Sequence, residues 1–304
     1  MNKKELFLEI GYFVVFVVAS LFVSQFLALV ALLPLHDFKL QELMLKMNDP
    51  LRYPEMKMQL LTIQGLSSFL SFVAAPMAFI IWKEKYWRSF LSSNLNSKFQ
   101  LIGITIAIML VSMPFVSVVI EWNEHWVLPE PFAQWASEKE DFLKKLTQML
   151  TTLNNPFELS VGLVVIALLP ALGEELVFRG YLQNKFKVLL GNPHIAIWLS
   201  AFLFSAIHFQ FYGFVPRMML GAMFGYIYHA TGQFHLPVLA HFTNNGLMLV
   251  MMYLKNHGYI QFDIESETQV PVLLSCISFT LTCFLFVLIT RQLERSSIKS
   301  VPFL

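Results

Sequence analysis

The chain has 304 residues, of which 56% are hydrophobic and only 13% are charged. A soluble globular domain is about 25% charged, so the composition excludes that class and indicates an integral membrane protein surrounded by a lipid bilayer. The net charge of +1 provides no electrostatic basis for a nucleic-acid partner. Cys276 and Cys283 lie in one apolar run and predict neither a disulfide framework nor a metal cluster.

Candidate membrane spans occur eight times along the chain. A spanning helix needs about 20 mostly apolar residues. The runs are residues 11–33, 60–82, 101–120, 159–182, 194–211, 218–230, 236–254 and 271–289. The first exceeds the usual apolar length of a signal peptide and lacks a clear cleavage site, so we expect it to be retained. The pattern predicts an all-α fold, a polytopic membrane helix bundle with about eight transmembrane helices.

The loop after the third run is acidic and contains a second periodic pattern. Apolar side chains recur there at helical spacing, at Phe142, Leu143, Leu146, Met149, Leu150 and Leu153. This spacing predicts an amphipathic helix that lies at the membrane interface.

The distribution of basic residues predicts the orientation of the chain. Lysine and arginine cluster at the N-terminus, after the second and fourth runs, and at the C-terminus. Basic loops stay on the cytoplasmic side. We therefore expect a multi-pass protein of the cell membrane with both termini in the cytoplasm and residues 121–157 on the far side.

The fourth run carries an unusual charged motif, residues 173–180, with the sequence GEELVFRG. Each charge in hydrocarbon costs about 2.5–3.5 kcal/mol, so Glu174, Glu175 and Arg179 need partners and a function. Residues four apart share a helical face, so Glu175 can pair with Arg179. Glu174 points about 100° away, and remains free to exchange protons.

Two later runs each contain a pair of motif residues at the same four-residue spacing. The fifth contains Phe204 and His208, and the seventh contains His241 and Asn245. Ionisable groups within membranes normally face the bundle interior or a water-filled cavity, so we expect these side chains to converge with Glu174. A carboxylate and two imidazoles supply a base for water and donors for the leaving amine and the oxyanion. Glu174, His208 and His241 also form a possible zinc-ligand set with an open fourth position.

Each polar residue alone has a structural interpretation. Glu175 and Arg179 can form a structural ion pair, and His208, His241 and Asn245 can form hydrogen bonds between helices. Five charged or titratable side chains on three spans are costly without a use, so the combination favours an active site. A proton-coupled transporter is the alternative that also places Glu and His in mid-membrane, although no internal repeat is visible. A non-catalytic scaffold or immunity factor is the third interpretation.

The motifs at Glu174-Glu175-x-x-x-Arg179, Phe204-x-x-x-His208 and His241-x-x-x-Asn245 resemble those of one family, in the same order. This is the CAAX-processing and bacteriocin-processing (CPBP, or Abi) family of intramembrane endopeptidases, and the resemblance covers residues 159–254, about a third of the chain. Gly221, Gly225, Gly232 and Pro237 also follow the family's pattern.

The resemblance implies an intramembrane endopeptidase acting on a membrane-associated peptide or protein. Glu174 and His208 would activate water, Glu175 and Arg179 would support them, and His241 with Asn245 would stabilise the oxyanion. It leaves the cofactor open between zinc and a metal-free glutamate mechanism. We divide the chain accordingly into residues 1–158, a three-span region with the interfacial helix; 159–254, the catalytic core; and 255–304, the last span and tail.

Overall fold

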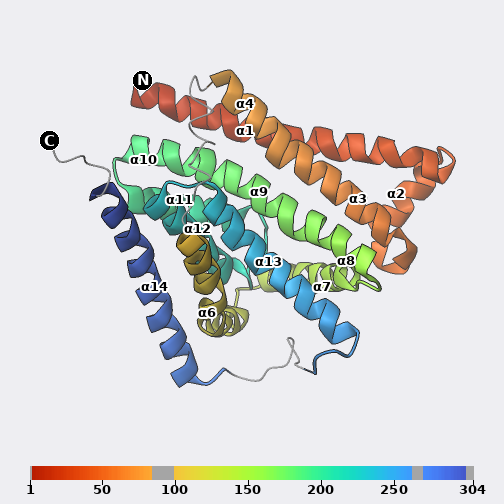
Figure 1. Cartoon of the computed structure of the whole chain (residues 1–304). Helices are drawn as coiled ribbons and strands as arrows, with labels where there is room; N and C mark the ends of the chain where they lie inside the picture. The colour runs from red at the N-terminus through yellow and green to blue at the C-terminus, as the bar shows by residue number, and fades with distance from the viewer. Residues whose placement is uncertain (1, 84–98, 262–269, 299–304) are drawn as a thin grey trace. The chain divides into compact units, whose positions relative to one another are not determined.

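The computed structural model describes the backbone of residues 2–83, 99–261 and 270–298, and side chains as far as residue 291. All regular elements in these ranges are helical, which confirms the all-α prediction (Figure 1). The chain divides into two compact units, each described by itself. The first unit is Met1–Lys85, Glu130–Val177 and Asn245–Glu265. The second is Tyr86–Pro129, Phe178–Asn244 and Ser266–Leu304.

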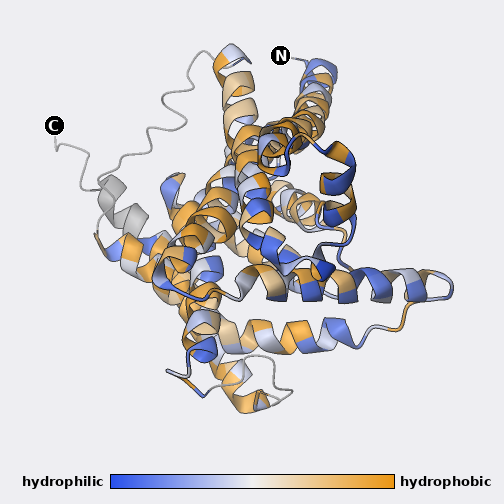
Figure 2. Ribbon diagram, turned by 90° about the vertical axis from the view of Figure 1, so that its right-hand side faces the viewer, coloured by the Kyte–Doolittle hydropathy of each residue, from blue (hydrophilic) through white to orange (hydrophobic). Residues whose placement is uncertain are grey.

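Five helical stretches in the described ranges are long and apolar enough to cross a membrane, so the chain is a multi-pass membrane protein. They are Lys3–His36, Pro54–Lys83, Phe99–Glu124, Pro156–Leu190 and Val272–Arg291. These stretches contain the first four expected spans and the eighth. Figure 2 shows hydrophobic residues along much of the ribbon.

The fifth, sixth and seventh expected spans are helices that do not meet these criteria. They are α11 (Pro193–Ala206), α12 (Phe214–Thr231) and α13 (His235–Asn256). The first is a shorter apolar helix. The other two carry polar side chains, among them the expected site residues His241 and Asn245, which lower their apolar content. The number of eight spans therefore stays a prediction. The orientation also stays a prediction, and Lys85 and Arg88 of the basic cluster after the second run lie outside the described residues.

The first unit is built on a few long helices. Its elements are α1 (Lys3–Leu32), η1 (Leu33–His36), α2 (Leu40–Asn48), η2 (Pro50–Arg52), η3 (Pro54–Met56), α3 (Lys57–Ser68), η4 (Phe69–Ala74), α4 (Ala75–Lys83), α7 (Phe132–Thr151), α8 (Pro156–Gly162), η5 (Leu163–Leu168), α9 (Leu169–Glu175) and the second half of α13. Both α1 and α9 pack against α3 and η4. Two of these elements, η4 and η5, are π-helical. Such segments occur frequently at functional sites, and η5 directly precedes the helix that carries Glu174.

The helix predicted to lie at the interface, α7, begins ten residues before the apolar pattern found in the sequence. It runs from Phe132 to Thr151 and contains all the expected apolar residues except Leu153, which follows its end. Phe132, Trp135 and Ala136 continue the spacing of three and four residues toward the N-terminus, and this accounts for the longer helix.

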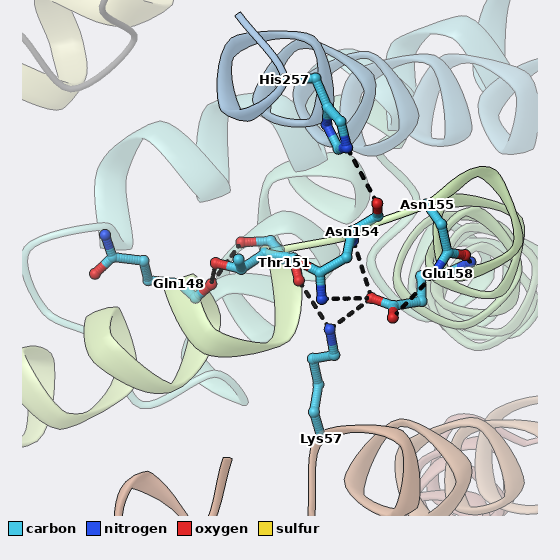
Figure 3. A network of polar contacts seen from close by, with 8 residues as sticks. Lys57, Gln148, Thr151, Asn154, Asn155, Glu158 and His257 are labelled. Atoms are coloured by element: carbon cyan, nitrogen blue, oxygen red, sulfur yellow. Dashed lines mark hydrogen bonds and ion pairs between the residues drawn. The ribbon is translucent and has the colours of Figure 1, made fainter. Parts of the chain in front are cut away.

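A polar network joins four helix ends of the first unit (Figure 3). The Lys57 ammonium lies 2.5 Å from the Glu158 carboxylate and donates to the Thr152 carbonyl at 2.9 Å. The same carboxylate accepts the Asn154 backbone N–H at 3.0 Å, and a ring nitrogen of His257 lies 3.2 Å from the Asn154 carbonyl. The start of α3, the end of α7, the start of α8 and the end of α13 are thereby tied together.

The second unit contains α6 (Phe99–Glu124), α10 (Asn184–Leu190), α11, α12, the first half of α13 and α14 (Val272–Ile298). Residues 178–183 belong to a third π-helix, η6 (Leu176–Gln183). Helix α12 packs against α11, α6 and α14. Its core includes Ile108 and Met109 of α6 with Phe224 and Ile227 of α12.

Pro114 interrupts the hydrogen bonding of α6, and α14 fills the gap. In a regular helix the Phe115 N–H would donate to the Val111 carbonyl. Here the Phe115 N–H donates to the Ser278 hydroxyl at 3.2 Å, and this hydroxyl donates to the Val111 carbonyl at 2.5 Å. A side chain inserted into the helical ladder is a known cause of a bend, and in α6 it also fixes the contact with α14.

Gly173 allows the backbone of α9 to approach η4 closely. A Cβ atom at this position would lie 2.6 Å from the Phe72 Cβ and 3.1 Å from the Phe72 carbonyl carbon. Since backbone atoms cannot turn aside as a flexible side chain can, only glycine fits here. The next residue is Glu174, so this contact sets how the carboxylate helix packs within its unit.

We expect Gly173→Ala to lower the free energy of unfolding by about 1–3 kcal/mol, the usual scale of overpacking. Gly11→Ala is the matched control, because nothing lies within 4 Å of its added Cβ. Alanine in a helix interior is favoured over glycine by about 0.5–1 kcal/mol, so the control should not destabilise. Unfolding of both variants in detergent would show this, and equal stabilities would contradict the assigned packing.

Candidate active site

The six predicted site residues are divided between the two units. Glu174 and Glu175 of α9 and Asn245 of α13 belong to the first unit, whereas Arg179, His208 and His241 belong to the second. The structure brings the last three together around one aromatic ring, that of Phe204.

The two carboxylates differ in burial, as their different helical faces predict. Glu175 is completely buried, whereas Glu174 is partly accessible. Successive residues on a helix point about 100° apart, so packing covers one and leaves part of the other open. Glu174 is therefore the more accessible of the two carboxylates.

Arg179 is fully buried in the second unit and is held by a carbonyl and aromatic rings. Its Nη2 donates to the Gly221 carbonyl at 2.6 Å. The guanidinium carbon lies 4.7 Å from the ring centroid of Phe204 and 5.4 Å from that of Phe224. A Cβ at position 221 would lie 3.1 Å from Nη2 and would crowd the guanidinium. Ring faces attract cations, and these contacts compensate part of the lost hydration.

His241 packs against the same two phenylalanines. Its imidazole stacks on the Phe224 ring at a centroid distance of 4.9 Å and an interplanar angle of 15°. The Phe204 ring meets it edge-on at 5.8 Å. The side chain is only 4% exposed, so its orientation is fixed by packing on two sides.

His208 lies just beyond the end of α11, where backbone geometry sets its tautomer. Its Nδ1 is 2.8 Å from the Phe204 carbonyl oxygen. A carbonyl can only accept, so we assign the proton to Nδ1, which leaves Nε2 with a lone pair. The Phe204 ring lies 5.4 Å from the His208 ring. The geometry thus presents Nε2 as a base or a metal ligand.

The loop that carries His208 is held by a residue that the sequence analysis missed. Asn123, at the end of α6, is fully buried. Its Nδ2 donates to the Phe211 carbonyl at 3.1 Å, and its Oδ1 accepts the Val215 N–H at 2.9 Å. The Ser205 hydroxyl donates to the Phe214 carbonyl at 2.6 Å. These bonds fix both sides of the turn after His208.

The same loop contains an uncommon backbone conformation. Phe209 adopts a φ of 52°, in the left-handed region that bulky residues rarely occupy. Its N–H donates to the Ala206 carbonyl at 3.1 Å, which closes the C-terminus of α11 without a glycine. A conformation of this kind persists only where surrounding bonds hold it, and Asn123 and Ser205 supply such bonds.

No group of three His, Cys, Asp or Glu side chains in the described ranges is arranged to hold a metal ion. Glu174 belongs to one unit and both histidines to the other, so each unit by itself supplies only part of the expected zinc set. The set Glu174, His208 and His241 stays a prediction.

Residues 156–247 match the sequence model of a family described as type II CAAX prenyl endopeptidase Rce1-like. The predicted resemblance to the CAAX-processing family is thereby confirmed for the segment that carries all six site residues. The chain is also 31% identical over 84 residues to the uncharacterized protein YpbD of Bacillus subtilis (strain 168). That alignment covers 26% of this chain and 40% of the relative. No solved structure matches.

We expect Asn123→Ala to loosen the His208 loop. Any catalytic rate that depends on His208 should fall by about 10–100-fold, because displacing a catalytic group by about 1 Å can lower the rate about 10²-fold. Amide exchange of residues 207–215 should rise in the same variant, which can be measured without a substrate. Thr105→Val is the matched control, since Thr105 is equally buried in α6 but bonds only to its own helix, at the Leu101 carbonyl. If amide exchange of the loop were the same in both variants, the role of Asn123 in holding the loop would be ruled out.

Proposed function

We propose that the chain is an intramembrane endopeptidase that hydrolyses a peptide bond in a membrane-associated peptide or protein. One observation carries the proposal: two imidazoles share the Phe204 ring inside the Rce1-like segment, and one presents an unprotonated Nε2. A general base needs a ring nitrogen with a lone pair, and the tautomer assigned to His208 supplies one.

The chemistry distributes the roles as follows. Glu174 and His208 take a proton from water, whose oxygen attacks the peptide carbonyl carbon. His241 and Asn245 donate hydrogen bonds to the oxyanion that forms. The C–N bond then breaks, and the abstracted proton passes to the leaving amine.

Glu175 and Arg179 act as supporting groups in this scheme. Glu175 is fully buried, and Arg179 packs on the rings that hold both histidines. A buried charge that loses its partner is strongly destabilising, so these residues maintain the site and do not touch the reacting atoms.

The substrate enters from the bilayer, in keeping with the apolar helices. We propose that the protein resides in the cell membrane with both termini in the cytoplasm, as the basic clusters predict. The matching family is described as a type II CAAX prenyl endopeptidase. The broader class, a membrane-associated peptide segment, is the one that we propose here.

We expect Glu174→Gln to abolish hydrolysis of a membrane-peptide library while the protein's melting temperature stays nearly unchanged. The amide keeps the shape of the side chain but cannot accept a proton. Glu158→Gln is the contrasting variant, because it breaks the contact with Lys57 at the start of the same helical stretch. This control should melt earlier but retain hydrolysis below its melting temperature. Substantial hydrolysis by Glu174→Gln would refute the proposed role.

A separate experiment decides between a metal-free and a zinc mechanism. We expect the active enzyme to contain no stoichiometric metal, and Asn245→Ala to lower kcat by about 10²–10³-fold, the usual effect of removing one oxyanion donor. Elemental analysis of the active protein, with and without a chelator, supplies the measurement. Stoichiometric zinc that is lost in His241→Ala would establish the zinc mechanism instead.

A further inference from the structure

The second unit contains a polar cavity that none of the predicted site residues lines. It has a volume of about 120 Å³ and is partly open. Its lining residues come from η6, α10, α11 and α12 and the turn that follows: Gln183, Asn184, Lys187, Pro193, Tyr228, His229 and Gly232. Since roughly 10–15 Å³ of such space holds one water molecule, the cavity has room for a phosphate group.

The cavity is lined by hydrogen-bond donors. Lys187 provides an ammonium group, and His229 provides an imidazole whose ring lies 6.1 Å from that of His194. The Tyr228 hydroxyl accepts a hydrogen bond from the Asn184 Nδ2 at 2.9 Å. An amide nitrogen only donates, so the phenolic hydrogen is directed to another acceptor. Asn184 is itself fixed by donation to the Gly180 carbonyl at 2.8 Å.

The charge of this region favours an anionic ligand. The sequence has no Asp or Glu between residues 176 and 262. Residues 178–244 of the second unit contain four lysines and arginines and five histidines. The segment that builds the cavity therefore supplies basic groups and no carboxylate of its own, which favours an anionic ligand over a cationic one.

The helices that line the cavity also expose apolar side chains. Val188 and Leu190 of α10 and Trp198 of α11 are 68%, 42% and 44% exposed. A free phosphate ion has no use for such a surface, whereas the acyl chains of a lipid do. Lys187 also closes the fourth span on the side predicted to be cytoplasmic, where basic pockets between transmembrane helices bind lipid head groups.

We propose that this cavity binds the phosphate group of an anionic membrane lipid, with Lys187 as its charge partner and His229 and Tyr228 as further hydrogen-bond donors. The site is separate from the proposed catalytic residues. Its test measures binding alone, so the result does not depend on whether the chain is a protease.

The full chain, purified in detergent, is titrated with phosphatidylglycerol and with phosphatidylcholine of the same acyl chains. Native mass spectrometry counts the retained lipid, and the melting temperature reports its binding. We expect one retained phosphatidylglycerol and a rise in melting temperature. Lys187→Gln should weaken binding at least about 10-fold, because hydrogen bonds to charged groups contribute about 1.5–3 kcal/mol.

Lys185→Gln is the matched control. It removes the same charge from the same helix, but Lys185 lies over the Tyr181 ring at 5.2 Å and does not line the cavity. The control should bind as the wild type does. Tyr228→Phe, which removes a single oxygen, should weaken binding by a smaller factor with the fold intact.

Three outcomes would overturn the proposal. Equal weakening in Lys187→Gln and Lys185→Gln would show that lipid responds to the overall surface charge and not to the cavity. Inorganic phosphate that displaces phosphatidylglycerol and raises the melting temperature equally would identify a free anion as the ligand. Equal binding of phosphatidylglycerol and phosphatidylcholine would also overturn the proposal, because it would show that the cavity does not select an anionic lipid.

Discussion

The buried guanidinium of Arg179 is the group on which the second unit's arrangement depends. Removing a charge from water costs several kcal/mol even after relaxation, so the fold must surround it with compensating groups. The Gly221 carbonyl and the rings of Phe204 and Phe224 do this. The same two rings contact His208 and His241. The packing that accommodates one cation therefore also orients both imidazoles.

In the first unit, a close backbone contact positions the helix that carries the two carboxylates. Its carboxylates lie on α9, which approaches η4 so closely at Gly173 that no side chain fits. At the other end of the same helical stretch, the Lys57–Glu158 network anchors α8 to α3, α7 and α13. A site residue placed on a rigid helix is held more precisely than one on a loop. The two units thus hold their polar groups by different interactions.

The features that could be predicted from sequence are those set by local composition. Apolar run length gave the all-α class and the five long spans, and the spacing of Glu174, Glu175 and Arg179 marked the charged helix. Helical periodicity also found α7, although its start was wrong because the apolar residues before position 142 were not included. The six site residues were identified through motif order, and their catalytic roles remain proposals.

Other features depend on partners distant in sequence, and local patterns carry no information about them. Asn123 is 88 residues from the Phe211 carbonyl that it holds. A single amide at the end of an apolar run was the available signal, but nothing near it indicated its partner. The cavity around Lys187 is likewise lined by residues of both α10 and α12, which are far apart in the sequence. Only the absence of acidic residues between 176 and 262 could have suggested an anion site.

The missing hydrogen bond at Pro114 affects the stiffness of α6. The half before the proline packs in the core with Phe224, and the half after it carries Asn123 one residue before its end. A helix with a missing bond bends more easily than an intact one, and here one hydroxyl, that of Ser278, bridges the gap. The stiffness of α6 therefore depends on α14. The same helix holds the His208 loop through Asn123, so the contact of α14 with α6 also supports the element that positions this loop.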